Sequence, residues 1–391
     1  MNTTLKHWKE AATLILAAGR GRGFTPRAPL TGESSSGQSH LPHRSLFDYD
    51  VLLLKRSGKS GFMPNAYVFP GGVVDASDFS SEWLDIFRSF TNSPTFGLRS
   101  VKQHLETRPP IFATDRLKLG SPIPGEVALR ICALRETFEE SGVLLVAPKI
   151  EEKKMLKNIK DFGYIEHYGV NDLCSSELTK WRALVNQNPS NFIRMCRELQ
   201  VLPNIWALHE WGNWLTPASR YGTTRFDTAF FICCLQEIPH SYKMIRKLSW
   251  STPSEILQSY QAQELWIAPP QFYELSRLCR FPLLNDLHNF ASQRATAGCE
   301  QWMPVVVSND EHHISLLPGD KLYPVDSPRD SEAAKNTVPP SKDHQDASPL
   351  HRIVISDRYT LRVQITITPK YNHVLPVAHS AVSHDSKSHK L

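Results

Sequence analysis

The segment from Glu126 to Ser141 constrains the fold more than any other part of this 391-residue sequence. Its apolar residues recur at spacings of four, three and four, which predicts a helix with one apolar stripe. That stripe consists of Val127, Ile131, Leu134 and Phe138. Gly142 follows at the position where helices commonly end on a left-handed residue. We therefore expect a helix whose apolar face packs in the core.

The same helix carries three carboxylates on another face. Glu136, Glu139 and Glu140 fall within an arc of roughly 100°, because residues three and four apart lie on neighbouring turns. Like charges at this spacing weaken a helix by roughly 0.2–0.5 kcal/mol per pair, and the helix dipole also disfavours anions in the last turns. A Mg²⁺ ion held by one or two carboxylates and substrate phosphates would resolve this conflict. The alternative is a solvated acidic face partly neutralised by Arg130 and Arg135.

The residues around these carboxylates stand in a specific order. Arg135, Glu136, Glu139, Glu140 and Gly142 give R-E-x-x-E-E-x-G, followed by an apolar Val143. This order closely resembles the second half of the signature of the Nudix hydrolases. The first half of that signature contains a Gly-Gly turn, which FPGG at 69–72 resembles. The resemblance implies an α/β Nudix fold, with a mixed β-sheet sandwiched between helices.

The spacing of the two halves departs from the family pattern. Gly72 and Arg135 are 63 positions apart, 49 more than in the uninterrupted signature, so residues 73–125 form a long insertion in the Nudix box. Glu126 lies nine positions before Arg135, where the signature has eight, and Val127 occupies the expected place. Because the carboxylates lie on one short helix, we expect the insertion to serve substrate choice and not metal binding.

A second motif stands just upstream of the insertion. LLLKRSGKSGFMPNAYVFPGG at 52–72 resembles the coenzyme A signature of the family's CoA diphosphatases. The matching positions are Leu52, Leu53, Arg56, Ser57, Phe69, Pro70, Gly71 and Gly72. Three positions depart from it, with Leu54 in place of a Thr, Gly61 in place of a second Arg and Asn65 in place of a Gly. Arg56, Lys55 and Lys59 are the candidates for binding the 3′-phosphate or the diphosphate.

Further stretches, such as PNIWALHEWGNWLTP at 203–217 and ELWIAPPQFYEL at 264–275, extend the resemblance to the family's peroxisomal acyl-coenzyme A diphosphatases. It implies hydrolysis of the diphosphate of coenzyme A and of acyl-CoA, with Mg²⁺ or Mn²⁺, to 3′,5′-ADP and 4′-phosphopantetheine or its acylated form. It implies these site residues: Glu136 and Glu140 as metal ligands, Glu139 and Arg135 as catalytic groups, and Arg56, Ser57, Gly71 and Gly72 as substrate-binding groups. Glu210, Glu237 and Glu264 remain open as a further ligand or base, or as packing carboxylates.

The rest of the chain divides by composition and pattern. We predict a Nudix domain over 10–262, a C-terminal extension of helices and strands over 263–325, and a β segment with a targeting tail over 351–391. Residues 326–350 are dense in Ser, Pro, Asp and Lys, which predicts a disordered linker. Alternation over 352–367 predicts a hairpin. Short strands are expected at 13–16, 50–55, 66–69, 143–146 and 226–235, and helices within 150–200.

Composition excludes several classes of protein. A net charge of only +5 does not favour a nucleic-acid partner, and no apolar run reaches the roughly 18–20 residues that cross a bilayer. Seven Cys without a C-x-x-C pair favour neither a disulfide framework nor a zinc knuckle. The final residues, His389 to Leu391, resemble a peroxisomal import tail that an import receptor would bind. We expect a peroxisomal protein, with the mitochondrion or cytosol as alternatives.

Three other functions remain open from the sequence. The chain could act on another nucleoside diphosphate derivative, or it could be a Nudix-like binding module without activity. LILAAGRGRG at 14–23 also resembles the opening of sugar nucleotidyltransferases, although loop composition follows it where a phosphate-binding helix would be needed.

Overall fold

A computed structural model describes residues 8–21, 41–60, 63–91, 96, 98, 101–152, 175–217, 225–238, 248–308, 313–324 and 349–377. The import-like tail and nearly all of the expected linker lie outside these residues, so both stay predictions.

An eight-stranded mixed sheet forms the centre of the molecule, and β1 (Trp8–Gly19) is its longest strand. β1 pairs in parallel with β8 (Arg225–Leu235) and antiparallel with β2 (Tyr49–Lys55) and β4 (Gly71–Val73). The other strands are β3 (Tyr67–Val68), β7 (His209–Leu215), β9 (Leu248–Ser251) and β10 (Gln301–Trp302). The mixed sheet confirms the expected fold class.

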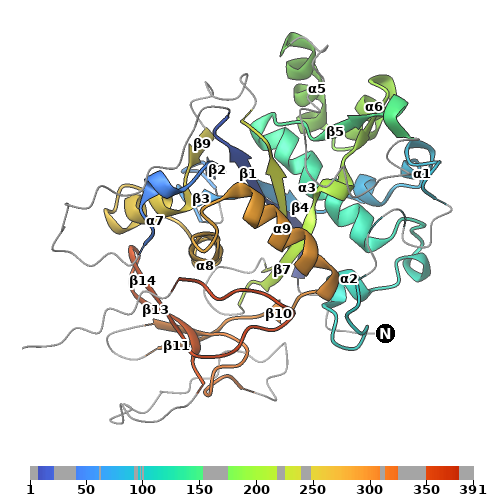
Figure 1. Cartoon of the computed structure of the whole chain (residues 1–391). Helices are drawn as coiled ribbons and strands as arrows, with labels where there is room; N and C mark the ends of the chain where they lie inside the picture. The colour runs from blue at the N-terminus through green and yellow to red at the C-terminus, as the bar shows by residue number, and fades with distance from the viewer. Residues whose placement is uncertain are drawn as a thin grey trace, which may run out of the picture.

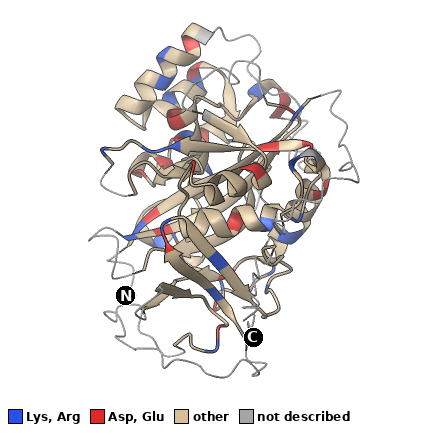
Figure 2. Cartoon of the chain, turned by 90° about the vertical axis from the view of Figure 1, so that its left-hand side faces the viewer, with Lys and Arg blue, Asp and Glu red and all other residues tan. Residues whose placement is uncertain are grey.

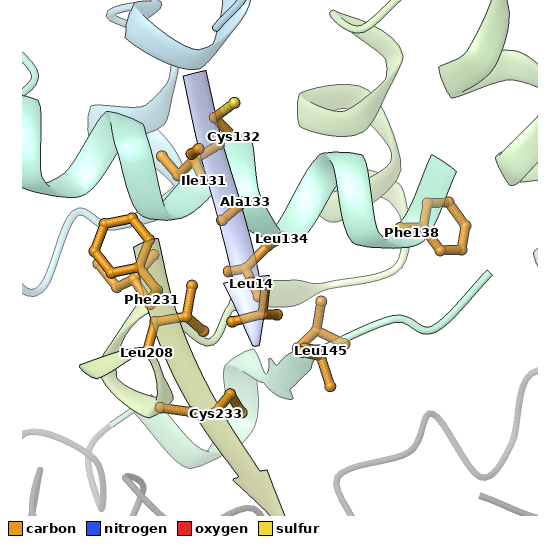
Figure 3. Packing of buried hydrophobic residues seen from close by; sticks show 14 of the residues in the cluster. Leu14, Ile131, Cys132, Ala133, Leu134, Phe138, Leu145, Leu208, Phe231 and Cys233 are labelled. Atoms are coloured by element: carbon orange, nitrogen blue, oxygen red, sulfur yellow. The ribbon is translucent and has the colours of Figure 1, made fainter. Parts of the chain in front are cut away.

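The central strand separates two apolar cores. Leu14 and Leu16 of β1 point into one core, and Ile15 and Ala17 point into the other, because successive side chains of a strand face opposite ways. All four side chains are fully buried. Figure 3 shows Leu14 facing Leu134 of the helix that crosses β1. A strand buried on both faces requires helices on both sides.

Helices cover both faces of the sheet (Figure 1). The first core is closed by α1 (Trp83–Ile86), α2 (Pro110–Ala113), α3 (Gly125–Ser141), α5 (Ser175–Gln187) and α6 (Asn191–Glu198). The second core is closed by α7 (Pro253–Gln261), α8 (Pro269–Leu278) and α9 (Leu284–Arg294). The helix expected at 126–141 is α3, so that prediction is confirmed. The strand expected at 143–146 is wrong in its bounds, because β5 spans Val146–Pro148 and pairs with β6 (Val201–Pro203).

A second sheet of four antiparallel strands follows in the chain. It consists of β11 (Val305–Ser308), β12 (His313–Leu316), β13 (His351–Asp357) and β14 (Thr360–Ile365). β13 and β14 form the hairpin expected at 352–367, and β11 and β12 come from the other side of the expected linker. Figure 1 shows this C-terminal sheet at the bottom of the molecule. Its buried residues Ile353 and Val363 join the core under α7 and α8.

Charges of both signs are interspersed over the ribbon, as Figure 2 shows. Within the described residues, no helix has the length and apolar character needed to cross a membrane. The six cysteines among them are buried and free of disulfide bonds.

A buried histidine joins the C-terminal sheet to the large domain. His351 of β13 is fully buried, and its Nε2 lies 3.0 Å from the hydroxyl of Tyr273 on α8. Its Nδ1 lies 2.7 Å from the carbonyl oxygen of Pro318. Burial lowers the pKa of His351 to about 4, from an ordinary value of 6.5. The folded chain therefore holds this imidazole neutral.

We expect acid to weaken this junction. In the unfolded chain His351 takes up a proton below about pH 6.5, whereas in the folded chain it stays neutral down to about pH 4. The contribution of the neutral, buried His351 to stability is therefore present at neutral pH and is lost as the pH falls from about 6.5 to about 4. The loss should reach about 3 kcal/mol in the free energy of unfolding at the lower end of that window. Urea titrations at a series of pH values, compared with His351→Gln, measure it. Identical acid losses in both proteins would contradict this assignment.

Candidate active site

Helix α3 ends where its carboxylates lie, and a second helix stabilises that end. Gly142 has φ +83°, and its N–H donates to the carbonyl oxygen of Phe138, so the predicted left-handed cap is confirmed. Arg182 of α5 donates from Nε to the carbonyl oxygen of Glu139 at 2.8 Å and from Nη2 to that of Glu140 at 2.6 Å. A cation at the helix C-terminus offsets the negative end of the helix dipole, which disfavours the acidic side chains in the last turn. The sequence offers no local signal for this contact, because Arg182 lies more than forty residues from Glu139 and Glu140.

Arg135 binds three carboxylates at once. Its Nη1 donates to Glu136 Oε1 at 2.9 Å and to Glu139 Oε1 at 2.7 Å. Its Nε and Nη2 donate to the two carboxylate oxygens of Asp78, both at 2.8 Å. Arg135 and Asp78 are each only 1% exposed. A buried guanidinium with this partner set fixes the orientation of the Glu136 and Glu139 side chains.

Asp78 is a site residue that sequence reasoning missed. It belongs to a short 3-10 helix, Ala76–Phe79, whose first turn is capped by Asp75. The D-x-x-D spacing of Asp75 and Asp78 ahead of Phe79 is a capping-box pattern and was the available signal. Asp78 lies within 73–125, so part of the insertion contacts the arginine that orients the carboxylates, while the expectation that the insertion serves substrate choice and not metal binding stays a prediction. Its first turn helps to build the carboxylate cluster.

The Gly-Gly segment lies directly against the carboxylates. The Gly71 N–H donates to Glu140 Oε2 at 3.0 Å. A Cβ at Gly72 would lie 2.5 Å from the carboxyl carbon of Glu136, so any side chain there would displace that carboxylate. The backbone of this segment therefore approaches the carboxylates closely. Gly71 and Gly72 themselves belong to the strand β4, although their sequence suggested a turn.

Burial changes the acidity of the two inner carboxylates. Burial raises the pKa of Glu136 to about 7, with the neighbouring Glu139 adding to the rise and Arg135 opposing it. Burial also raises the pKa of Glu140 to about 7, while the Gly71 N–H and Arg56 oppose the rise. A nearby cation would stabilise the ionised form of both carboxylates and would lower both pKa values.

Five of the predicted residues line one cavity of about 380 Å³. These are Arg56, Gly71, Gly72, Glu136 and Glu140. The chain brings them together because β4 runs alongside β1, and α3 packs on both strands. Metal-ligand candidates and substrate-binding candidates therefore share one wall, although they come from segments that the insertion separates in sequence.

Other predicted residues lie outside that lining. Ser57 is exposed in a turn where its Oγ accepts from the Lys59 N–H at 3.2 Å. Glu139 is held by Arg135. Glu210 is buried and binds Arg108 through both carboxylate oxygens, at 3.1 and 2.8 Å, so it is a packing carboxylate. Arg108 also pairs with Glu126. Neither Glu237 nor Glu264 lines the cavity.

The donor set suits a hard divalent cation. Glu136 and Glu140 present carboxylate oxygens to the cavity, which matches the one or two carboxylates by which Mg²⁺ is typically held alongside substrate phosphates. Within the described ranges, no group of three or more His, Cys, Asp or Glu side chains is placed to hold a metal ion. Glu136 and Glu140 are therefore the two carboxylates that could hold one here.

Family models cover most of the chain. The NUDT19 Nudix domain matches residues 8–278, and the NUDT19 C-terminal domain matches residues 306–366. The second range corresponds to the four strands of the C-terminal sheet. The segment 14–23, which suggested a nucleotidyltransferase, falls inside the Nudix match, where residues 14–19 are part of the central strand.

Individual proteins are also similar to this chain. The chain is 48% identical over 388 residues to the acyl-coenzyme A diphosphatase NUDT19 of Xenopus laevis, covering 96% of this chain and 97% of that protein. It is 39% identical over 378 residues to the human protein of the same name, covering 94% of each. A crystal structure of a NUDIX hydrolase from Alicyclobacillus acidocaldarius aligns at 20% identity with a TM-score of 0.45, covering 72% of this chain and 96% of that chain.

We predict that Gly72→Ala disrupts the cluster. The added Cβ must displace the Glu136 carboxylate, so Mn²⁺ affinity should fall by about 10- to 100-fold, as is typical when a ligand loses its support. Gly212→Ala is the matched control, because a Cβ there meets nothing within 4 Å. Mn²⁺ titration followed by electron paramagnetic resonance measures both. Equal affinities in the two variants would show that Gly72 does not position Glu136.

Proposed function

This chain belongs to the NUDT19 family of Nudix hydrolases, and from that premise we propose that it hydrolyses the diphosphate of coenzyme A and of acyl-CoA thioesters. The products are 3′,5′-ADP and 4′-phosphopantetheine or its acylated form. The single observation that carries the proposal is the shared cavity, in which Glu136 and Glu140 lie beside the Gly-Gly segment and Arg56. Relatives named acyl-coenzyme A diphosphatases supply the substrate class.

Glu136 and Glu140 would hold the Mg²⁺ or Mn²⁺ ion. Such an ion, when bound, polarises a phosphoryl oxygen and lowers the pKa of a bound water. The protein supplies the orientation of the ligands. Arg135 holds Glu136 from one side, and the Gly71 N–H holds Glu140 from the other. Glu139, fixed by the same guanidinium, is our candidate for orienting the attacking water.

Arg56 is the cation of the substrate-binding wall. Its Nη2 donates to Ser60 Oγ at 2.9 Å, which orients the guanidinium at the end of β2. It lies close enough to Glu140 to oppose the rise in that pKa. A cation beside the metal-binding carboxylates is suited to a phosphoryl oxygen of the scissile diphosphate. We therefore assign Arg56 to the diphosphate in preference to the 3′-phosphate.

Two other functions are separable by assay. A Nudix hydrolase of another specificity would cleave a substrate such as ADP-ribose faster than coenzyme A. A silent binding module would release no 3′,5′-ADP at all, and all three carboxylates of the signature are present here, which favours an active enzyme. Peroxisomal import stays a proposal that rests on the tail alone.

We predict that Glu140→Gln removes most activity without unfolding the protein. The amide oxygen can still accept from the Gly71 N–H, but a neutral ligand binds a divalent cation poorly. The kcat for release of 3′,5′-ADP should fall by about a hundredfold or more. Thermal stability should stay level or rise, because repulsion between carboxylates is relieved. Glu198→Gln, on the exposed face of α6, is the control. Near-normal turnover of Glu140→Gln at saturating Mg²⁺ would show that Glu140 is not a metal ligand.

We also predict that Arg56→Ala weakens binding of coenzyme A and dephospho-CoA equally. A charge-assisted hydrogen bond contributes about 1.5–3 kcal/mol, so both KM values should rise roughly 10- to 100-fold. Arg88→Ala, which removes an exposed arginine that does not line the cavity, should change neither. A larger loss for coenzyme A than for dephospho-CoA would instead place Arg56 at the 3′-phosphate.

A further inference from the structure

The cavity that holds the carboxylates continues to a wall of different chemistry. Its lining includes Val306, Ser315, Ile353 and Ile355 of the C-terminal sheet. Figure 1 shows that sheet at the bottom of the molecule and α3 in the upper half. The two structural units that the family models describe separately therefore contribute to one cavity.

Strand register explains why these residues face the cavity together. Val306 of β11 pairs with Ser315 of β12, and Ser315 pairs with Ile353 of β13. Directly paired residues lie on the same face of a sheet, so the three form one row across neighbouring strands. Ile355 lies two positions after Ile353 and shares its face. The row is therefore one continuous face of the C-terminal sheet, and strand pairing fixes the positions of its residues.

The charge of the lining decides which part of a substrate this wall suits. Of the described residues that line the cavity, the charged ones are Arg56, Glu136 and Glu140, all at the carboxylate end. The remaining walls are mostly apolar, and they include Trp214 and Pro269 beside the C-terminal row. An adenosine 3′-phosphate would need cations that this part of the cavity lacks. An alkyl chain needs only apolar surface.

We propose that the row on β11, β12 and β13 binds the acyl chain of a thioester substrate whose diphosphate lies at Glu136 and Glu140. This assignment rests on the proposed function, since it places one end of the same molecule. The cavity volume of about 380 Å³ lies within the roughly 300–1,000 Å³ usual for small-molecule sites. Each methylene that leaves water on binding should lower KM by roughly fourfold until the cavity is full.

The test compares two adjacent valines of β11. Val306 lines the cavity and Val305 does not, although both are partly exposed and both occupy the same strand. Val306→Trp fills the cavity, and Val305→Trp adds the same bulk to the opposite face. The assay measures kcat/KM for 3′,5′-ADP release from coenzyme A and from acetyl-, octanoyl- and palmitoyl-CoA. We expect Val306→Trp to lower the ratio of palmitoyl-CoA to coenzyme A activity about tenfold or more, and Val305→Trp to leave it unchanged.

The outcomes distinguish a failure of the acyl-chain assignment from a failure of the proposed hydrolysis of coenzyme A. If the wild-type chain released no 3′,5′-ADP from any of these substrates, the proposed function would fail. If it did so normally and both variants kept the wild-type ratio, the acyl wall alone would be wrong. Equal losses on coenzyme A and on all thioesters would also overturn it, because the row would then bind the shared part of the substrate. If Val306→Trp does not fold, Val306→Thr keeps the shape, and its buried hydroxyl should lower the ratio roughly fivefold.

Discussion

The buried guanidinium of Arg135 is the interaction on which the site depends. It donates to both carboxylate oxygens of Asp78, and it holds Glu136 and Glu139 in fixed orientations on α3. Removing one partner of such a buried pair typically costs about 3–5 kcal/mol, because the other is left as an uncompensated charge. The same residue joins three segments, since its Nη2 also donates to the carbonyl oxygen of Val73 at 3.2 Å. The insertion, the Gly-Gly strand and the carboxylate helix are thus held in one arrangement.

On the other face of the sheet, a second buried carboxylate, Glu274, also connects several segments through hydrogen bonds. Glu274 of α8 accepts from the indole N–H groups of Trp211 at 2.7 Å and Trp214 at 2.9 Å. Its neighbour Arg277 pairs with it at 3.2 Å and donates to the carbonyl oxygen of Val374. This network connects β7, α8 and the segment after the C-terminal sheet. It fixes Trp214, which lines the cavity, relative to the sheet that forms the far wall.

The sequence predicted well those features that are set by residues close together in the chain. The apolar stripe, the carboxylate order and the Gly142 cap all lie within α3, so periodicity and spacing were sufficient. The central strand was predicted too short, because β1 is buried on both faces and lacks the alternation that identifies a strand. Asp78, Arg182 and the row on the C-terminal sheet reach the site through tertiary contacts across tens to hundreds of residues. No local pattern encodes those contacts, although the capping box at Asp75 marked one of them.

The electrostatics of the cluster explain why the cation and the diphosphate belong together. Arg135 alone cannot balance Asp78, Glu136 and Glu139, and Glu140 adds a further carboxylate beside them. Because burial raises the pKa of Glu136 and of Glu140 to about 7, proton uptake can relieve this repulsion near neutral pH. A divalent cation held by Glu136 and Glu140 would compete with those protons for the same oxygens and would bring positive charge to the cavity. With that charge and Arg56 beside it, the cavity would accept the diphosphate of an anionic substrate, although two carboxylates line the same wall.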